Sequence, residues 1–373
     1  PVAQRIERRV RRLLVLRRET LEGLQREYEA YSTDLIQRVT ALTGLLAQRD
    51  EFAQFISQRI FWLRSAAPLL ATRVPRDWQE PARKYGTLLR ALGRDARTDP
   101  LPYVLAGLAV VALLVARPRL RAMLGAMRER VARPYTDSFA LTWRAVWCTA
   151  LLSVPWPAAL WFLASRIGAV SNEADPDAYG AAQALVAGLR TVVVTALILE
   201  LLRQICRPDG LGEVHFRWHA GALRVLRWNL AWLMLVSLPL VLIITAAERY
   251  PQRVWGDSVG RAAFVLVCVA LSAFAACVLH PTKGAVADWL RKGGAVWLYR
   301  LRYVWYVAAV LLPLVFAATS ISGYHYTALQ FFGRLNRTVW RLGLGLLVLH
   351  ALLLRAVLVA QRKLAVEKAR QRR

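Results

Sequence analysis

Residues 229–247 read NLAWLMLVSLPLVLIITAA, nineteen positions without a charged side chain. An α-helix rises about 1.5 Å per residue, so a helix of this length matches the hydrocarbon core of a bilayer, which is roughly 30 Å thick. Six more apolar runs of similar length occur. The run at 145–165 contains Pro155 and Pro157, which predict a kink. We predict seven membrane-spanning helices, at 98–116, 145–165, 181–202, 229–247, 262–280, 303–321 and 338–360.

The uneven distribution of apolar residues indicates the fold class. Of the 373 residues 57% are hydrophobic, and the mean hydropathy is +0.34. Residues 1–97 contain no long apolar run, whereas residues 98–373 contain all seven. We therefore predict an all-α polytopic membrane protein, in which a helical region at 1–97 outside the membrane precedes a multi-helix membrane domain at 98–373.

Residues 1–56 show the pattern of one long helix. Large apolar residues recur every seven positions, and a second row follows three positions after the first. This seam indicates a coiled coil or helical hairpin, and an amphipathic helix packed on a globular core explains it equally well. Residues 57–97 are expected to form a linker, because three prolines interrupt the helical pattern there. The two rows are Leu14, Leu21, Tyr28, Leu35 and Leu42, and Leu24, Tyr31, Leu45 and Phe52.

The basic residues predict the orientation of the chain in the membrane. The net charge is +27, which in a soluble protein suggests nucleic acid, but no nucleic-acid-binding motif is present. One set of segments carries 22 Lys and Arg, namely 117–138, 203–227, 281–302 and 361–373; the alternate loops 166–180, 248–261 and 322–337 carry six. The positive-inside rule places the first set and the C-terminal end in the cytoplasm, and the N-terminal region outside. We expect the lipid bilayer, and no nucleic acid, as a partner.

Polar residues inside the apolar runs are candidates for a functional role, because a charge in the hydrocarbon core is costly. Arg190 and Glu200 share the third run, and His350 lies in the seventh. Snorkelling towards a membrane boundary explains side chains near the run ends as well. Tryptophans near the run ends or in loops suit anchoring at the headgroup level. These are Trp143, Trp161, Trp228, Trp255, Trp289, Trp297 and Trp340.

No residue pattern indicates catalysis, a cofactor or a metal. The sequence has no P-loop, no dinucleotide-binding fingerprint and no nucleophile with a partnered base. His215 and His219 have a metal-ligand spacing, but the glutamate of an HExxH motif is missing. The four cysteines form no CxxC pair and read as small buried side chains. We expect a protein that is not an enzyme and holds no cofactor.

Three runs in combination resemble a known family. They are QRIFWLRSAAPL at 58–69, GLGEVHFRWHAGALRVLR at 210–227, and SGYHYTALQFFGRL at 322–335 with the tail RKLAVEKARQRR at 362–373. In this order they resemble the large bacterial members of the MscS superfamily of mechanosensitive channels, of the MscK and MscM type. The resemblance covers roughly residues 57–373, and residues 1–56 fit the end of the periplasmic coiled coil of that family.

The resemblance implies a homo-oligomeric channel, heptameric, in the bacterial inner membrane, with its N-terminal region in the periplasm. Such a channel opens under membrane tension in hypo-osmotic shock and releases ions and osmolytes. The sequence shows no Gly- and Ala-rich pore helix followed by a β-rich domain, so we expect a fragment that holds the auxiliary membrane domain without the pore module. Two other functions stay open: a secondary transporter or exporter subunit, and a purely structural membrane anchor for a periplasmic coiled coil.

Overall fold

The computed structural model describes residues 2–59, 64–72, 75, 77–133, 135–171, 176–287 and 299–371. All regular structure in these residues is helical, which confirms the all-α prediction. The chain divides into two compact units, residues 1–63 and residues 64–373.

The first unit contains one continuous helix, α1 (Val2–Arg59). Ion pairs one turn apart, such as Arg18 with Glu22 at 2.8 Å, line its surface and each contribute a few tenths of a kcal/mol. Its predicted seam is exposed to solvent: Tyr28 is 73% and Leu42 60% exposed. Within the first unit the described part of α1 leaves the seam open, and both readings of it stay predictions.

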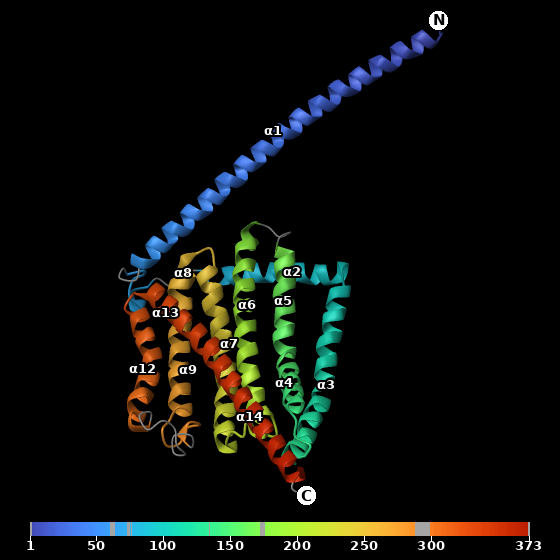
Figure 1. Ribbon diagram of the computed structural model, residues 1–373. Helices are drawn as coiled ribbons and strands as arrows, with labels where there is room; N and C mark the ends of the chain where they lie inside the picture. Colours follow the sequence, from blue (N-terminus) through green and yellow to red (C-terminus); the bar gives the residue numbers. More distant parts are fainter. Residues whose placement is uncertain are drawn as a thin grey trace. The chain divides into compact units, whose positions relative to one another are not determined.

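The second unit is a bundle of long helices (Figure 1). Short turns connect several of them: the 3₁₀ turn η2 (Leu69–Ala71) and the π-helical turns η3 (Leu211–His215), η4 (Gly256–Gly260) and η5 (Thr338–Gly343). The helices are α2 (Gln79–Thr98), α3 (Leu101–Ala132), α4 (Phe139–Ser153), α5 (Pro155–Ser171), α6 (Pro176–Ile205), α7 (Ala220–Arg249), α8 (Arg253–Trp255), α9 (Arg261–Val278), α12 (Arg302–Ile321), α13 (His325–Arg337) and α14 (Leu344–Gln371).

The lengths of these helices agree with a polytopic membrane protein. Within the described residues, six helices are long and apolar enough to cross a bilayer, and the count is seven if α4 and α5 form one span. The axes of α4 and α5 differ by 47° at Val154. Pro155 and Pro157 account for this break, because proline lacks a backbone N–H and its ring clashes with the preceding helical turn. The predicted kink is therefore present.

Helix α6 lies at the centre of the bundle between α5 and α7. Gly188 allows α6 and α7 to approach closely: a Cβ at this position would lie 2.8 Å from Cδ1 of Leu242 and 3.1 Å from its carbonyl oxygen. Helix α2 lies across α5 and α6 and buries Leu88 against them. Because of this packing, residues 64–97 belong to the second compact unit, although their composition groups them with residues 1–63.

Candidate functional site

The three predicted polar residues do not come together. Arg190 on α6 and His350 on α14 are exposed. Glu200 is buried near the end of α6, where its carboxylate accepts hydrogen bonds from Nε of Arg203 at 2.8 Å and from Nε2 of Gln204 at 2.6 Å. These residues therefore do not form the central polar pair that a transporter site needs.

The predicted tryptophan anchors differ in their surroundings. Trp255 is buried and packs edge-on against Trp78 and Tyr250, with ring centroids 5.4 and 6.0 Å apart. Trp340 is partly exposed and lines a cavity. Trp289 and Trp297 lie outside the described residues. The side chains that face outward, as lipid anchors must, are Trp143, Trp161 and Trp228.

A buried ion-pair network joins the last helix to the start of α4. Asp137 precedes α4, and its two carboxylate oxygens bind different arginines of α14: Oδ1 binds Arg355, and Oδ2 binds Nη1 of Arg362 at 2.6 Å. The side chains of Asp137 and Arg355 are each only 1% exposed. Removing the Asp137 carboxylate would leave the charge of Arg355 buried and unpaired, so this network fixes α14 on the turn between α3 and α4.

The same network reaches the turn that precedes α7. Nε of Arg355 donates to Oγ1 of Thr142 at 3.3 Å, and this hydroxyl lies 3.1 Å from Nδ1 of His215. Thr142 thus links the imidazole of His215 to the guanidinium of Arg355. Burial and the charge of Arg355 lower the pKa of His215 to about 4. His215 is therefore neutral at physiological pH.

At the opposite end of α7, the segment that follows α1 docks on the bundle. The backbone N–H groups of Ser65 and Ala66 donate to the carbonyl of Gly323 at 3.1 and 3.2 Å, and Oγ of Ser65 accepts from the N–H of Tyr326 at 3.1 Å. Gly323 has φ +105°, and a Cβ there would lie 2.6 Å from the carbonyl oxygen of Ala66. Glycine is required on both counts. Two of the runs that carry the family resemblance are thus in direct contact.

Arg261, the first residue of α9, holds this outer junction together. It is completely buried, and its guanidinium donates to the carbonyl oxygens of Ala67 at 2.8 Å and Ser320 at 2.6 Å. The hydroxyl of Ser320 lies 2.8 Å from Nδ1 of His325, and Nε2 of His325 lies 2.8 Å from a carboxylate oxygen of Glu248. The linker and four helices, α7, α9, α12 and α13, therefore share one polar network.

Helix α2 is bound to the bundle at both of its ends. Near its start, Glu80 accepts from Gln252 at 2.9 Å, and a hydrogen bond from Lys84 lowers the pKa of its carboxyl. Near its end, the carboxylate of Asp95 accepts from Arg166 of α5 at 2.5 and 2.7 Å, which lowers the pKa of Asp95. Both carboxylates are charged at neutral pH, so α2 is held in place by charge as well as by its apolar face.

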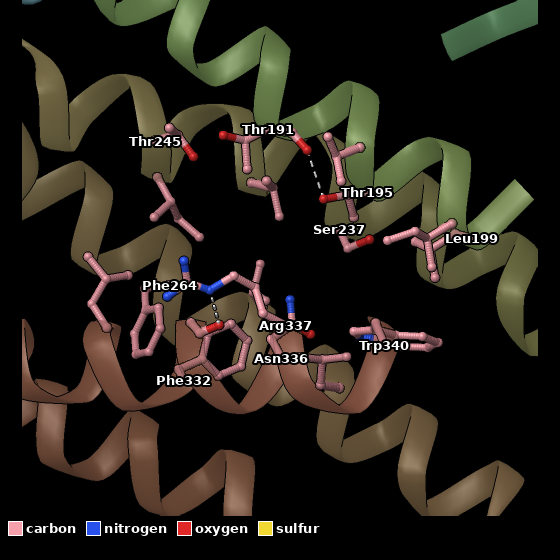
Figure 2. Close-up of a pocket in the computed structure, with 18 of the residues that line it drawn as sticks. Thr191, Thr195, Leu199, Ser237, Thr245, Phe264, Phe332, Asn336, Arg337 and Trp340 are labelled. Carbon is pink, nitrogen blue, oxygen red and sulfur yellow. Dashed lines mark hydrogen bonds between the residues drawn. The ribbon is translucent and has the colours of Figure 1, made fainter. Parts of the chain in front are cut away.

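A partly open cavity of about 480 Å³ lies between α6, α7, α9, α13 and η5. Figure 2 shows Thr191 and Thr195 on one side of it and Phe332, Asn336 and Arg337 on the other. Phe264 and Leu271 of α9 also line it. The hydroxyl of Ser237 is buried in this wall and has no hydrogen-bond partner among the described residues.

The sequence did not predict how these residues join into two networks, although it indicated His215 as a candidate ligand and Arg355 as a charge inside an apolar run. Asp137 lies in the segment 117–138, whose Lys and Arg residues indicate only the orientation of the chain. Arg261, Glu248 and His325 lie just beyond the ends of apolar runs. One signal was available: Arg355 lies inside the seventh run, and a buried arginine needs an acidic partner. Acids close to the run ends are the candidates for that partner.

These features define a helical membrane domain in which buried polar networks hold the helices together at both ends of α7. The family model described as the inner membrane domain 1 of mechanosensitive ion channels (MscS_TM) matches residues 100–373. The chain therefore belongs to this family, as the resemblance of the three runs predicted, and it is a multi-pass protein of the inner membrane.

A curated relative supports the same assignment. The chain is 30% identical over 248 residues to the miniconductance mechanosensitive channel MscM of Escherichia coli K12. This alignment covers 65% of the chain and 21% of MscM, so the chain spans about a fifth of the length of that relative. No solved structure shows a significant match.

Proposed function

We propose that this chain is an auxiliary membrane domain that couples membrane tension to a mechanosensitive channel during hypo-osmotic shock. In this proposal the N-terminal region lies in the periplasm and the C-terminal end in the cytoplasm. The full-length protein is a homo-oligomer, heptameric by resemblance, and its pore for ions and osmolytes is formed by parts outside this chain. The domain itself has no catalytic role.

The observation that carries the proposal is the network of Asp137, Arg355 and Arg362. Helix α3 is a lipid-facing helix: its most apolar window contains no buried residue, whereas its far end buries Leu124 and Met127 in a cluster with α4. The ion pairs connect the turn after α3 to α14. A movement of α3 with the surrounding lipid is thereby passed to the last helix of the chain.

Tension selects between states by their area in the membrane plane. A state in which α3 leans outward occupies more area, so tension raises its population without any chemical step. Buried ion pairs suit such a coupling, because a pair with excellent geometry resists partial separation. The bend between α4 and α5 and the outward-facing tryptophans give further surfaces on which the bilayer acts.

Patch-clamp recording from cells in which the full-length protein is the only mechanosensitive channel tests the proposal. We expect a tension-gated current, and we expect Asp137→Asn to shift its threshold tension while Asp209→Asn, in an exposed pair with Arg128, leaves it unchanged. A complete absence of tension-gated current from the unaltered full-length protein would overturn the channel assignment. A current with the same threshold in both variants would overturn the proposed route through α14.

A further inference from the structure

The cavity between α6, α7, α9 and α13 contains two arginines for which the described residues supply no counter-charge. The side chain of Arg190 makes no hydrogen bond or ion pair with any described residue. Arg337 uses its Nε on the carbonyl of Gly333 at 3.1 Å, and no carboxylate of the described chain pairs with it. Two cations at the wall of one cavity repel each other, so this arrangement favours an anion between them.

The depth of the cavity suits a group drawn in from the membrane surface. Gly188 lies against Leu242 and Ala246, so Arg190 is close to that level of α7. Helix α7 ends at Arg249, seven residues beyond Leu242, which is about 10 Å at 1.5 Å per residue. A long arginine side chain at this depth can meet a headgroup that enters from the nearer surface.

Much of the lining beside these arginines is apolar. Val241, Phe264, Val267 and Leu271 line the cavity, and they suit a hydrocarbon chain rather than water. The hydroxyls of Thr191 and Thr195 donate to carbonyls of their own helix, so they need no ligand. The hydroxyl of Ser237 is the exception, because it is buried and unpartnered among the described residues.

A second copy of this membrane domain is a poor source of the missing anion. The seven predicted spans contain only two acidic residues, Asp99 and Glu200. Asp99 lies at the very start of its span, and Glu200 is buried and bound to Arg203. The bilayer itself supplies negative charge at this depth through the phosphate of its lipids, which a long arginine side chain can reach.

We infer that this cavity binds one phospholipid, with its phosphate between Arg190 and Arg337 and one acyl chain along Phe264 and Leu271. Phosphatidylglycerol, which carries a net negative charge, is preferred over zwitterionic lipid of the same chain length. This site does not depend on the proposed channel function, because it is defined by lipid binding alone.

Native mass spectrometry of the full-length protein in detergent, titrated with dioleoylphosphatidylglycerol, tests the inference. We expect one tightly retained lipid per chain, and about ten-fold weaker binding in the Arg190→Gln/Arg337→Gln variant. Arg253→Gln is the matched control, since it removes an exposed charge near the same end of α7 and should leave the affinity unchanged. Thr191→Phe, at an exposed position, fills the cavity without changing charge and should also displace the lipid.

Each other outcome has a definite meaning. Equal retention by the double variant and the unaltered protein would overturn the phosphate site. Equal affinity for dioleoylglycerol, which has the same chains and no phosphate, would overturn it as well. If the double variant instead loses subunits while its lipid binding is unchanged, a second copy covers the cavity and the inference is wrong.

Discussion

Gly323 shows how one residue can set the geometry of a junction between segments far apart in sequence. Its positive φ turns the chain from α12 into α13, and its missing side chain leaves room for the backbone of Ala66. Its carbonyl then accepts from two consecutive N–H groups of the linker. A single position thus combines a turn, a close approach and a shared acceptor.

Gly323→Ala should lower the stability of the protein markedly. The left-handed φ costs a non-glycine residue about 1 kcal/mol or more, and the collision at 2.6 Å forces the linker away in addition. We expect a lower midpoint in thermal unfolding followed by tryptophan fluorescence. Gly333→Ala is the control, because nothing lies within 4 Å of a Cβ there. Equal midpoints for the two variants would contradict this account of the junction.

Asp137→Asn should destabilise the protein by about 3–5 kcal/mol, because Arg355 then keeps a buried charge without a partner. Asp209→Asn removes the same charge from a pair that is about half exposed, and should change stability by less than about 1 kcal/mol. Chemical denaturation of both variants, compared with the unaltered protein, measures the difference. Similar losses in the two variants would show that burial of the Asp137 pair is unimportant.

His215 should make the protein acid-sensitive between pH 6.5 and about 4. Its pKa is lowered from 6.5 to about 4 in the folded state, so the unfolded state binds the proton first as the pH falls. Stability is therefore full above pH 6.5 and declines by about 3 kcal/mol down to pH 4. Unfolding measured across this range should lose most of that slope in His215→Asn and keep it in His219→Asn. An unchanged slope in the first variant would assign the acid sensitivity to other groups.

At the scale of elements, the length of the apolar runs predicted the long helices. The contacts between residues far apart in the sequence could not be predicted in this way. All seven apolar runs fall on helices, because a helix that must cross a bilayer is specified by its own composition. Asp137 and Arg355 are 218 residues apart, and Arg261 and Ala67 are 194 apart. No local periodicity reports such a contact, so the two networks are visible only in the folded chain. The break at Pro155 was predictable since its cause is local.

Helix α1 presents an apolar seam that we expect another copy of the helix to cover, because rows of large exposed apolar residues mark interaction surfaces. In a variant of the full-length protein from which all native cysteines are removed, Leu35→Cys should form a disulfide between copies under mild oxidation. Thr40→Cys lies on the opposite side of the heptad and should stay monomeric on a non-reducing gel. Cross-linking at both positions alike would rule out a defined seam.

At the scale of the whole molecule, the charge of the loops predicts the orientation of the domain. Tyr179 and Thr282 are exposed and belong to the segments 166–180 and 281–302, which are predicted to lie on opposite sides of the membrane. In the cysteine-free background, Tyr179→Cys should react with a membrane-impermeant maleimide in spheroplasts, whereas Thr282→Cys should react only after permeabilisation. The reverse pattern would show the inverted topology.

The junction at Gly323 also constrains how the protein is made. Ser65 and its acceptor at Gly323 are separated by 258 residues, so at roughly 5–20 residues per second Ser65 leaves the ribosome on the order of 13–50 seconds earlier. Throughout that interval the linker lacks the acceptor at Gly323, and once Arg261 has been synthesised it lacks the carbonyl of Ser320 until α12 is complete. A nascent chain that is interrupted before α13 would thus leave the N–H groups of the linker and the guanidinium of Arg261 unpaired at the membrane surface, where quality-control proteases act. Only the finished domain pairs these groups.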